Sequence, residues 1–242
     1  MEKRICAITM VRDGSFFLRK WVDWYGSEFG KDNLYIFFDG QDQVPPAFTE
    51  GCNVRIVPRV EGQVSKADKG RIAILSDCAR TLLDRYDFVI GTDVDEFITP
   101  DPSLGVSLSG FLSSLDVRGR KAFSPLGCDV VQNTSCEGAL DWQRPVLGQR
   151  SFALLSTRYT KASILCAKAS WGSGFHRVRG SDFKIIPGLF LFHFGCADAA
   201  GILSRISDPD LSTRGWDRHL RKRYRLLRTV SRLPARDWDL WT

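Results

Sequence analysis

The chain has 242 residues, of which 43% are hydrophobic and 26% are charged. This composition is typical of an ordinary globular protein, and the length is sufficient for one large α/β domain. No apolar stretch approaches the roughly 20 residues that span a bilayer. The seven cysteines lack Cys-x-x-Cys spacing, which argues against a disulfide framework or a zinc site. We therefore expect a cytoplasmic protein whose cysteines are reduced.

Strand and helix patterns alternate along the first hundred residues. Apolar, β-branched runs predict strands, and apolar residues at helical spacing predict amphipathic helices. The strands are expected at residues 5–11, 34–38, 53–60 and 88–90, and the helices at residues 15–25 and 66–86. Alternation of this kind implies parallel pairing with right-handed crossovers. The sequence therefore predicts a three-layer α/β/α sandwich.

The pattern is looser in the second half of the chain. A short helix is expected at residues 107–115, and strands are expected at residues 121–131, 152–155, 162–167 and 184–194. No repeat or low-complexity linker separates these elements from the first half. We therefore expect a single domain over residues 1–213, with a nucleotide-binding half at about 1–100 and an acceptor half at about 101–213.

Residues 214–242 form a basic tail. Between Arg214 and Arg236 there are nine Arg or Lys residues and one acid, a local charge of +8 in a chain whose net charge is +6. Apolar residues recur at helical spacing in the tail, which predicts an amphipathic helix. The helix either docks on the domain with its charged face in solvent, or contacts an anionic membrane or glycan. In the second case the protein would be peripheral at the inner face of a membrane.

Three carboxylates, Asp93, Asp95 and Glu96, occupy four positions after the strand expected at residues 88–90. Charge at the carboxyl end of a buried strand needs a cation or hydrogen-bond donors, and open α/β sheets bind ligands at this edge. If the strand continues, Asp93 and Asp95 share one face while Glu96 points away. Two carboxylates on one face suit Mg²⁺ or Mn²⁺, which leaves coordination positions for phosphates. Alternatively, Asp93 starts a turn and Glu96 is a solvated charge.

Several short motifs occur in an order that resembles one enzyme family. They are Ile8-Thr9-Met10-Val11-Arg12-Asp13 before a Trp-rich helix, Tyr35 to Gly40, Thr92-Asp93-Val94-Asp95-Glu96-Phe97, Trp142, Gln149-Arg150, Lys161, Gly174-Phe175-His176 and His193-Phe194. In this order they resemble glycosyltransferase family 2, and in particular its branch with an Asp-Val-Asp-Glu-Phe motif. The resemblance implies a GT-A-like sandwich with a central, mostly parallel sheet. It also implies a nucleotide-diphosphate sugar donor and a metal ion, Mn²⁺ or Mg²⁺.

The resemblance implies roles for residues on the donor side. Asp95 is the expected direct metal ligand, and Asp93 binds the metal or a ribose hydroxyl. An acid placed like Asp39 accepts a hydrogen bond from the nucleobase in this family; the alternative is an ordinary Asp-Gly turn. Arg12 contacts phosphate or ribose, or else pairs with Asp13 on the surface.

Four further residues are candidates for contact with the diphosphate or the metal. Arg71 can reach the donor, although the family has Gln at this place. Lys161 either neutralises donor phosphate or is an exposed strand-edge lysine. GT-A enzymes often complete the metal shell with a late histidine, which makes His193 and His176 candidates. His193 is otherwise a buried core residue, and His176, on a glycine-rich loop, otherwise touches the diphosphate or the acceptor.

An inverting transferase needs a carboxylate that deprotonates the acceptor hydroxyl. Asp141, beside Trp142, is our choice, and Glu137 and Asp129 are alternatives that spacing does not separate. Glu96 is expected to brace the acidic motif.

The resulting hypothesis is a glycosyltransferase that moves a sugar from a UDP- or GDP-sugar to a glycan, lipid or protein acceptor. The competing hypotheses are a metal-dependent phosphohydrolase or nucleotidyltransferase, and a binding module that acts through the tail on anionic surfaces. Phosphatases with a nucleophilic Asp-x-Asp carry it on their first strand, whereas here it follows the fourth. No nucleic-acid partner is expected.

Overall fold

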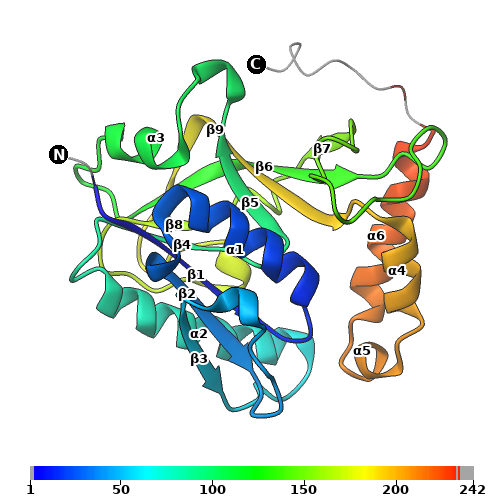
Figure 1. Ribbon diagram of the computed structural model, residues 1–242, viewed down its shortest axis with the longest axis horizontal. Helices are drawn as coiled ribbons and strands as arrows, with labels where there is room; N and C mark the ends of the chain where they lie inside the picture. The colour runs from blue at the N-terminus through cyan, green and yellow to red at the C-terminus, as the bar shows by residue number, and fades with distance from the viewer. Residues whose placement is uncertain (1–2, 233, 235–242) are drawn as a thin grey trace. The chain divides into compact units, whose positions relative to one another are not determined.

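The parallel part of the sheet is built around β1 (Ile5–Val11), in which all seven residues are buried. The computed structural model describes residues 3–232 and Pro234 and has an α/β architecture (Figure 1). β1 pairs in parallel with β2 (Leu34–Asp39) and with β4 (Phe88–Gly91), and β3 (Asn53–Val57) pairs in parallel with β2. The order β3-β2-β1-β4 means that the chain leaves β1 on one side and returns on the other. A topological switch point therefore lies between β1 and β4.

Five further strands extend the sheet. They are β5 (Glu96–Pro100), β6 (Ala122–Val131), β7 (Ala153–Leu155), β8 (Ile164–Leu165) and β9 (Lys184–Cys196). Beyond β4 the order is β8-β6-β9-β5, and β7 pairs with β6 outside this path. β8 is antiparallel to both β4 and β6, and β7 is antiparallel to β6. The structure confirms the α/β class and the large central sheet, whose parallel part is formed by the first four strands.

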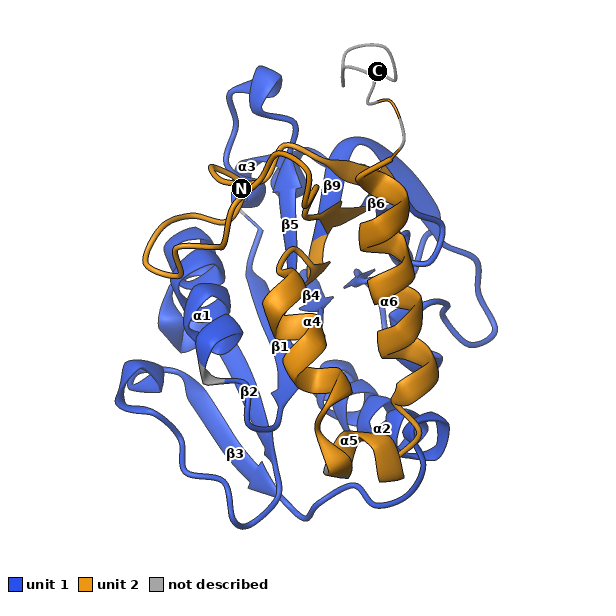
Figure 2. Ribbon diagram, turned by 90° about the vertical axis from the view of Figure 1, so that its right-hand side faces the viewer, with its two compact units in different colours: residues 1–127, 156–192 blue, residues 128–155, 193–242 orange. Residues whose placement is uncertain are grey.

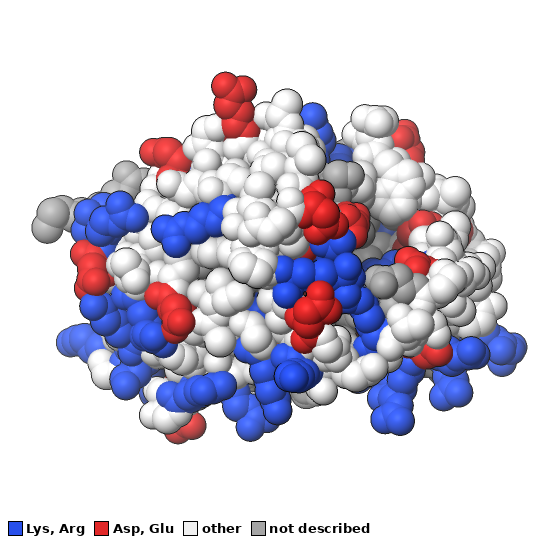
Figure 3. Space-filling model, turned by 90° about the horizontal axis from the view of Figure 1, so that it is seen from below, with Lys and Arg blue, Asp and Glu red and all other residues white. Residues whose placement is uncertain are grey.

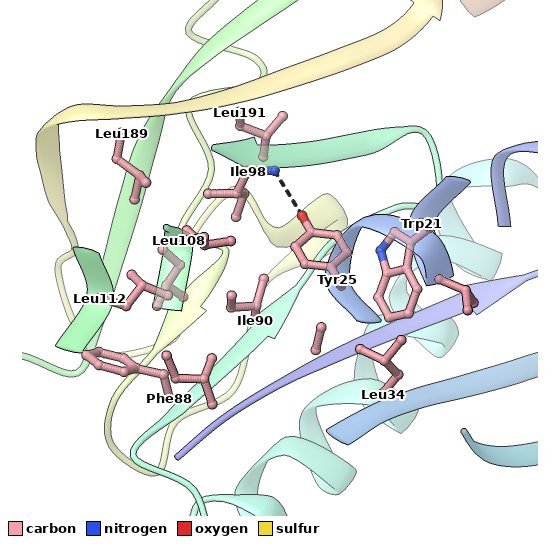
Figure 4. Packing of buried hydrophobic residues seen from close by; sticks show 14 of the residues in the cluster. Trp21, Tyr25, Leu34, Phe88, Ile90, Ile98, Leu108, Leu112, Leu189 and Leu191 are labelled. Carbon is pink, nitrogen blue, oxygen red and sulfur yellow. Dashed lines mark hydrogen bonds between the residues drawn. The ribbon is translucent and has the colours of Figure 1, made fainter. Parts of the chain in front are cut away.

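Helices cover both faces of this parallel part. Ala7 of β1 belongs to a hydrophobic cluster with the buried side of α1 (Ser15–Phe29), which is drawn in Figure 4. Its neighbour Ile8 belongs to a second cluster with α2 (Val64–Leu82). Successive residues of a strand point to opposite faces, so α1 and α2 lie on opposite sides of the sheet. The expected three layers are present here.

The chain divides into two compact units, which Figure 2 distinguishes by colour. The first comprises residues 1–127 and 156–192, and besides the parallel strands it contains α3 (Leu108–Ser114). Ser107 caps α3, because its hydroxyl accepts a hydrogen bond from the backbone N–H of Gly110 at 3.1 Å. The helix expected at residues 107–115 is thus confirmed.

The second unit comprises residues 128–155 and 193–242. Its described residues form three helices: α4 (Ala199–Ile206), α5 (Pro209–Thr213) and α6 (Asp217–Val230). The sequence pattern indicated α6 but neither of the two shorter helices. Asp198 is the signal that could have marked α4, because its carboxylate accepts a hydrogen bond from the N–H of Gly201 at 2.9 Å.

The basic helix is held by its apolar side. Leu227 and Val230 of α6 form a buried cluster with Ile202 of α4. Residue 233 and residues 235–242 of the expected tail lie outside the described residues. Within the part of the chain that the structure describes, no helix is long and apolar enough to cross a bilayer.

Candidate functional site

The carboxyl ends of β1 and β4 are fixed to each other at the switch point. The hydroxyl of Thr9 in β1 donates a hydrogen bond to the carbonyl of Thr92, just after β4, at 2.8 Å. The indole N–H of Trp21 in α1 donates to the Thr92 hydroxyl at 2.9 Å. All three side chains are buried, so these bonds are shielded from water. Strand, helix and turn therefore hold the segment that carries the acids in one position.

The acids lie on a turn and not on a continued strand. β4 ends at Gly91 and β5 begins at Glu96, and the N–H of Glu96 donates to the carbonyl of Asp93 at 3.1 Å, closing the turn. The expectation that Asp93 and Asp95 share one strand face while Glu96 points away is therefore wrong. Its physical reason is this turn, in which the N–H of Asp93 also donates to the Glu96 carboxylate at 3.3 Å.

Two cations from distant parts of the chain meet this acidic turn. The ammonium group of Lys161 donates to the Glu96 carboxylate and, at 3.3 Å, to Asp93 Oδ2. The guanidinium group of Arg71 in α2 donates to Asp93 Oδ1 at 2.5 Å and to Asp68 at 2.9 Å. The Glu96 side chain is 0% exposed and that of Lys161 is 4% exposed, whereas Asp93 retains 30% exposure. The alternative in which Lys161 is an exposed strand-edge lysine is thus wrong.

Charge pairing dominates the electrostatics of this cluster. Burial disfavours the charge on Asp93, but attraction to Arg71 and Lys161 outweighs it and lowers the pKa of Asp93 to about 2. Burial likewise opposes the charge on Lys161, but the attraction of Glu96 and then Asp93 raises its pKa above the ordinary value. Arg71 behaves in the same way beside Asp93 and Asp68, and its pKa is also raised. Asp93, Lys161 and Arg71 are therefore charged at neutral pH.

A glycine contact positions the loop that carries Lys161. Gly127 in β6 lies so close to this loop that an added Cβ would be 2.1 Å from the carbonyl carbon of Tyr159. The N–H of Gly127 donates to the Thr160 hydroxyl at 3.1 Å. Only a residue without a side chain allows this approach. The glycine therefore holds the ammonium group of Lys161 against the acidic turn.

The loop before His176 is anchored by a buried tryptophan. Trp171 is 1% exposed, and its indole N–H donates to the carbonyl of Ala162 at 2.8 Å. Because its ring is buried, Trp171 anchors this loop and does not offer an accessible surface on which a sugar could stack. His176 is exposed at the end of this loop. Its pKa is lowered by desolvation of the ring and by the neighbouring charge of Lys161, so His176 is neutral at pH 7.

Arg12 and Asp39 lie at the ends of the neighbouring strands β1 and β2. Arg12 donates to the carbonyl of Asp39 at 2.8 Å and binds the Asp42 carboxylate in a bidentate pair at 2.9 and 2.6 Å. Arg12 Nε also lies 3.3 Å from a carboxylate oxygen of Asp13, which agrees with the alternative that these two residues pair at the surface. One carboxylate oxygen of Asp39 accepts from the N–H of Val60 at 2.6 Å. Asp42 was not identified from the sequence, because only the fold brings it to Arg12.

His193 belongs to the second unit and is 2% exposed. Its Nδ1 lies 2.7 Å from the carboxylate of Asp129, and its Nε2 lies 3.2 Å from a guanidinium nitrogen of Arg223 in α6. Because arginine only donates, Nε2 accepts and the ring proton is on Nδ1, bonded to Asp129. A carboxylate on Nδ1 is the usual support of a metal-binding histidine, but here Arg223 faces the nitrogen that would bind the metal.

The three acids considered as the catalytic base also belong to the second unit. Asp141 is exposed, and one of its carboxylate oxygens accepts from the N–H of Gln143 at 2.9 Å. Both carboxylate oxygens of Glu137 accept backbone N–H bonds, at 2.7 and 2.8 Å, so this residue braces a loop. Asp129 is paired with His193. Among the three, only Asp141 combines an exposed side chain with proximity in sequence to the 37% exposed Trp142.

The donor set near the turn fits a divalent cation only in part. Among the described residues, no group of three or more His, Cys, Asp or Glu side chains could hold a metal ion by itself. Mg²⁺ and Mn²⁺ can bind through one or two carboxylates with substrate phosphates as further ligands. Asp95, which is half-buried on the turn, fits that role. Asp93 does not fit it in this arrangement, because its two oxygens contact Arg71 and Lys161.

Comparisons with known proteins give little further information. No protein-family model matches the chain, and no curated protein matches it. One similar solved structure is the crystal structure of mannose-1-phosphate geranyltransferase from Thermus thermophilus, which is 11% identical, with a TM-score of 0.34. The match covers 96% of this chain and 65% of that structure. A likeness of this size does not define a shared activity.

Proposed function

We propose that the chain is a glycosyltransferase that uses a nucleotide-diphosphate sugar. The observation that carries the proposal is the acidic turn, with Arg71 and Lys161 bound to it, at the carboxyl ends of β1 and β4. Open α/β sheets bind nucleotides at such a switch point. The strand order and the anchoring of this turn support the proposal independently of the motifs.

The contacts of the turn suggest a division of roles. Asp93 and Glu96 hold Arg71 and Lys161 in fixed positions, so both cations are pre-organised before an anion binds. Diphosphate oxygens would take up the remaining donor capacity of these cations, first at Arg71, whose side chain is 19% exposed, compared with 4% for Lys161. Asp95 would hold a divalent cation, Mn²⁺ or Mg²⁺, which would neutralise charge on the departing diphosphate.

Other residues would bind the remainder of the donor and the acceptor. Arg12 and Asp39 lie at the ends of β1 and β2, where the nucleoside is proposed to bind. His176, neutral and exposed, is proposed to contact the diphosphate or the metal. On the acceptor side, Asp141 is proposed as the base that removes the proton of the attacking hydroxyl, and Trp142 as a surface for a sugar ring. The acceptor would be a glycan, a lipid or a protein.

Calorimetry with UDP and GDP, with and without Mn²⁺, tests the donor site. We expect one of the two nucleotides to bind more tightly with Mn²⁺, and Asp95→Asn to remove the metal-dependent part. The matched control is Asp116→Asn, which changes an exposed acid paired with Arg118 and should leave binding unchanged. If Mn²⁺ changes the affinity for none of the nucleoside diphosphates tried, the proposal of a metal-dependent donor site is wrong.

Product analysis separates the proposed transferase from the competing hydrolase or nucleotidyltransferase. With a nucleotide sugar and an acceptor, a glycosyltransferase releases the nucleoside diphosphate and extends the acceptor. A phosphohydrolase instead cleaves a phosphate bond with water and needs no acceptor. A nucleotidyltransferase, in a parallel assay with added pyrophosphate, converts the nucleotide sugar to sugar phosphate and nucleoside triphosphate. Either of these products in place of an extended acceptor would contradict the proposal.

A further inference from the structure

α6 carries a row of exposed cations that the proposed site does not use. We call Arg218, Arg221, Lys222, Arg225 and Arg228 the basic face; all five side chains are exposed. At 3.6 residues per turn these positions fall within an arc of about 120°, and at 1.5 Å per residue they extend over about 15 Å. The basic face is therefore a straight, one-sided row of positive charge.

The opposite side of α6 is fixed within the second unit. Leu220, Leu227 and Val230 are buried, and Arg223 lies against the ring of His193. The hydroxyl of Ser231, just after the helix, is 2.9 Å from that of Thr134. Amphipathic helices that insert into a bilayer must expose their apolar side. α6 cannot do so while it is docked, so any contact through the basic face is electrostatic.

No ion pair joins the five cations of the basic face to another described residue. Like charges three and four positions apart, as in Arg218, Arg221, Lys222 and Arg225, destabilise a helix. Elsewhere in the chain some exposed arginines do have an acidic partner: Arg80 pairs with Asp77 and Arg118 pairs with Asp116. Figure 3 shows basic side chains gathered in patches on one face of the molecule, with acidic ones between some of them. The basic face thus carries a repulsion that an anionic partner would relieve.

We infer that the basic face binds the surface of an anionic lipid bilayer. A leaflet presents its anionic headgroups in a plane, so all five cations of a straight row can approach it together. The two exposed ring-bearing side chains of α6, His219 and Tyr224, lie outside the arc of the basic face, and α6 has no amide side chain that could read base edges. The basic face is therefore suited to bind anionic groups that lie in one plane.

Vesicle co-sedimentation of the full chain tests this inference. We expect binding at low salt to phosphatidylcholine vesicles that contain phosphatidylserine, and release when salt shortens the Debye length. Each basic residue near an anionic leaflet strengthens partitioning about fivefold, so Arg221→Gln/Lys222→Gln/Arg225→Gln should weaken it roughly 100-fold. Glutamine is a good helix former, so α6 should remain folded, which circular dichroism checks.

A variant with the same change in net charge is the control. Arg120→Gln/Lys121→Gln/Lys184→Gln removes three exposed cations from the first unit and should leave vesicle binding unchanged. The inference is overturned if pure phosphatidylcholine vesicles bind equally well, or if the control weakens binding as much as the α6 variant. Tighter binding to duplex DNA or RNA than to vesicles, lost in the α6 variant, would reassign the basic face to nucleic acid. None of these measurements depends on sugar transfer.

Discussion

Replacing Lys161 with methionine should destabilise the fold strongly. The methionine fills a similar volume but removes the cation from Glu96, whose side chain is 0% exposed. Removing one partner of a buried ion pair costs about 3–5 kcal/mol, a large part of the 5–15 kcal/mol typical of a whole domain. Without the ammonium group the pKa of Glu96 should rise, because burial favours the neutral acid. The loss should therefore be greatest at high pH and should shrink as the pH falls through the raised pKa.

Urea unfolding of the wild type and the variants between about pH 5 and 9 measures this effect. The double variant Lys161→Met/Glu96→Gln should recover much of the loss at high pH, because no buried charge remains. As a control, Lys168→Met disrupts a pair with Asp84 in which both side chains are more than half exposed, and it should cost less than about 1 kcal/mol. The reasoning is refuted if Lys161→Met costs no more than Lys168→Met, or if the double variant is no more stable than the single one.

Three further substitutions test the geometry around the turn. The pKa of Asp93 is about 2, so its ionised carboxylate stabilises the fold by about 2 kcal/mol above pH 4. Urea unfolding should therefore show that the wild type is more stable than Asp93→Asn, and that the difference in unfolding free energy narrows as the pH falls from 3.8 towards 2. A difference that does not change with pH would count against the charge pairing. In Gly127→Ala the new Cβ would lie 2.1 Å from the Tyr159 carbonyl carbon, which should lower Tm by about 3–10 °C. An unchanged Tm would mean that the loop can move. In Gly91→Ala the Cβ would lie 2.6 Å from the Phe175 ring and would displace the loop that carries Phe175 and His176. Nucleotide affinity measured by calorimetry should therefore fall. An unaltered affinity would show that this loop does not take part in the donor site.

The core of the first unit follows from local pattern. In β1, β2 and β4 nearly every residue is apolar and buried, which is the signature of parallel strands covered on both faces. α2 shows apolar residues at helical spacing. Each of these elements can be recognised from its own residues, so their type and order were predictable.

The arrangement of the acidic turn was not predictable in the same way. Whether the strand continues past Gly91 depends on bonds from Thr9 and Trp21, which lie more than seventy residues earlier in the chain. The partner of Glu96 is Lys161, 65 residues later, and no spacing rule connects them. By contrast, Asp68 and Arg71 are three residues apart on one helix, so their pairing is a local signal. Long-range pairs decide which acids are already neutralised.

The second unit shows the same limit. The amphipathic pattern of α6 predicted a helix, but nothing in that pattern indicates that Arg223 contacts His193. From the sequence, His193 could be either a metal ligand or a core residue. The sequence does not reveal that Asp129 lies at its Nδ1 and Arg223 at its Nε2. Metal binding by His193 would require its Nε2 to exchange Arg223 for a metal.

A crystal structure of the chain with Mn²⁺ and the nucleoside diphosphate that binds most tightly tests the central claim most directly. The anomalous signal of manganese would locate the metal, and the map would locate the diphosphate. We expect the metal at Asp95 and the diphosphate within hydrogen-bond distance of Lys161 and Arg71, at the carboxyl ends of β1 and β4. A nucleotide bound away from these strand ends, or a metal held without Asp95, would contradict the proposed donor site.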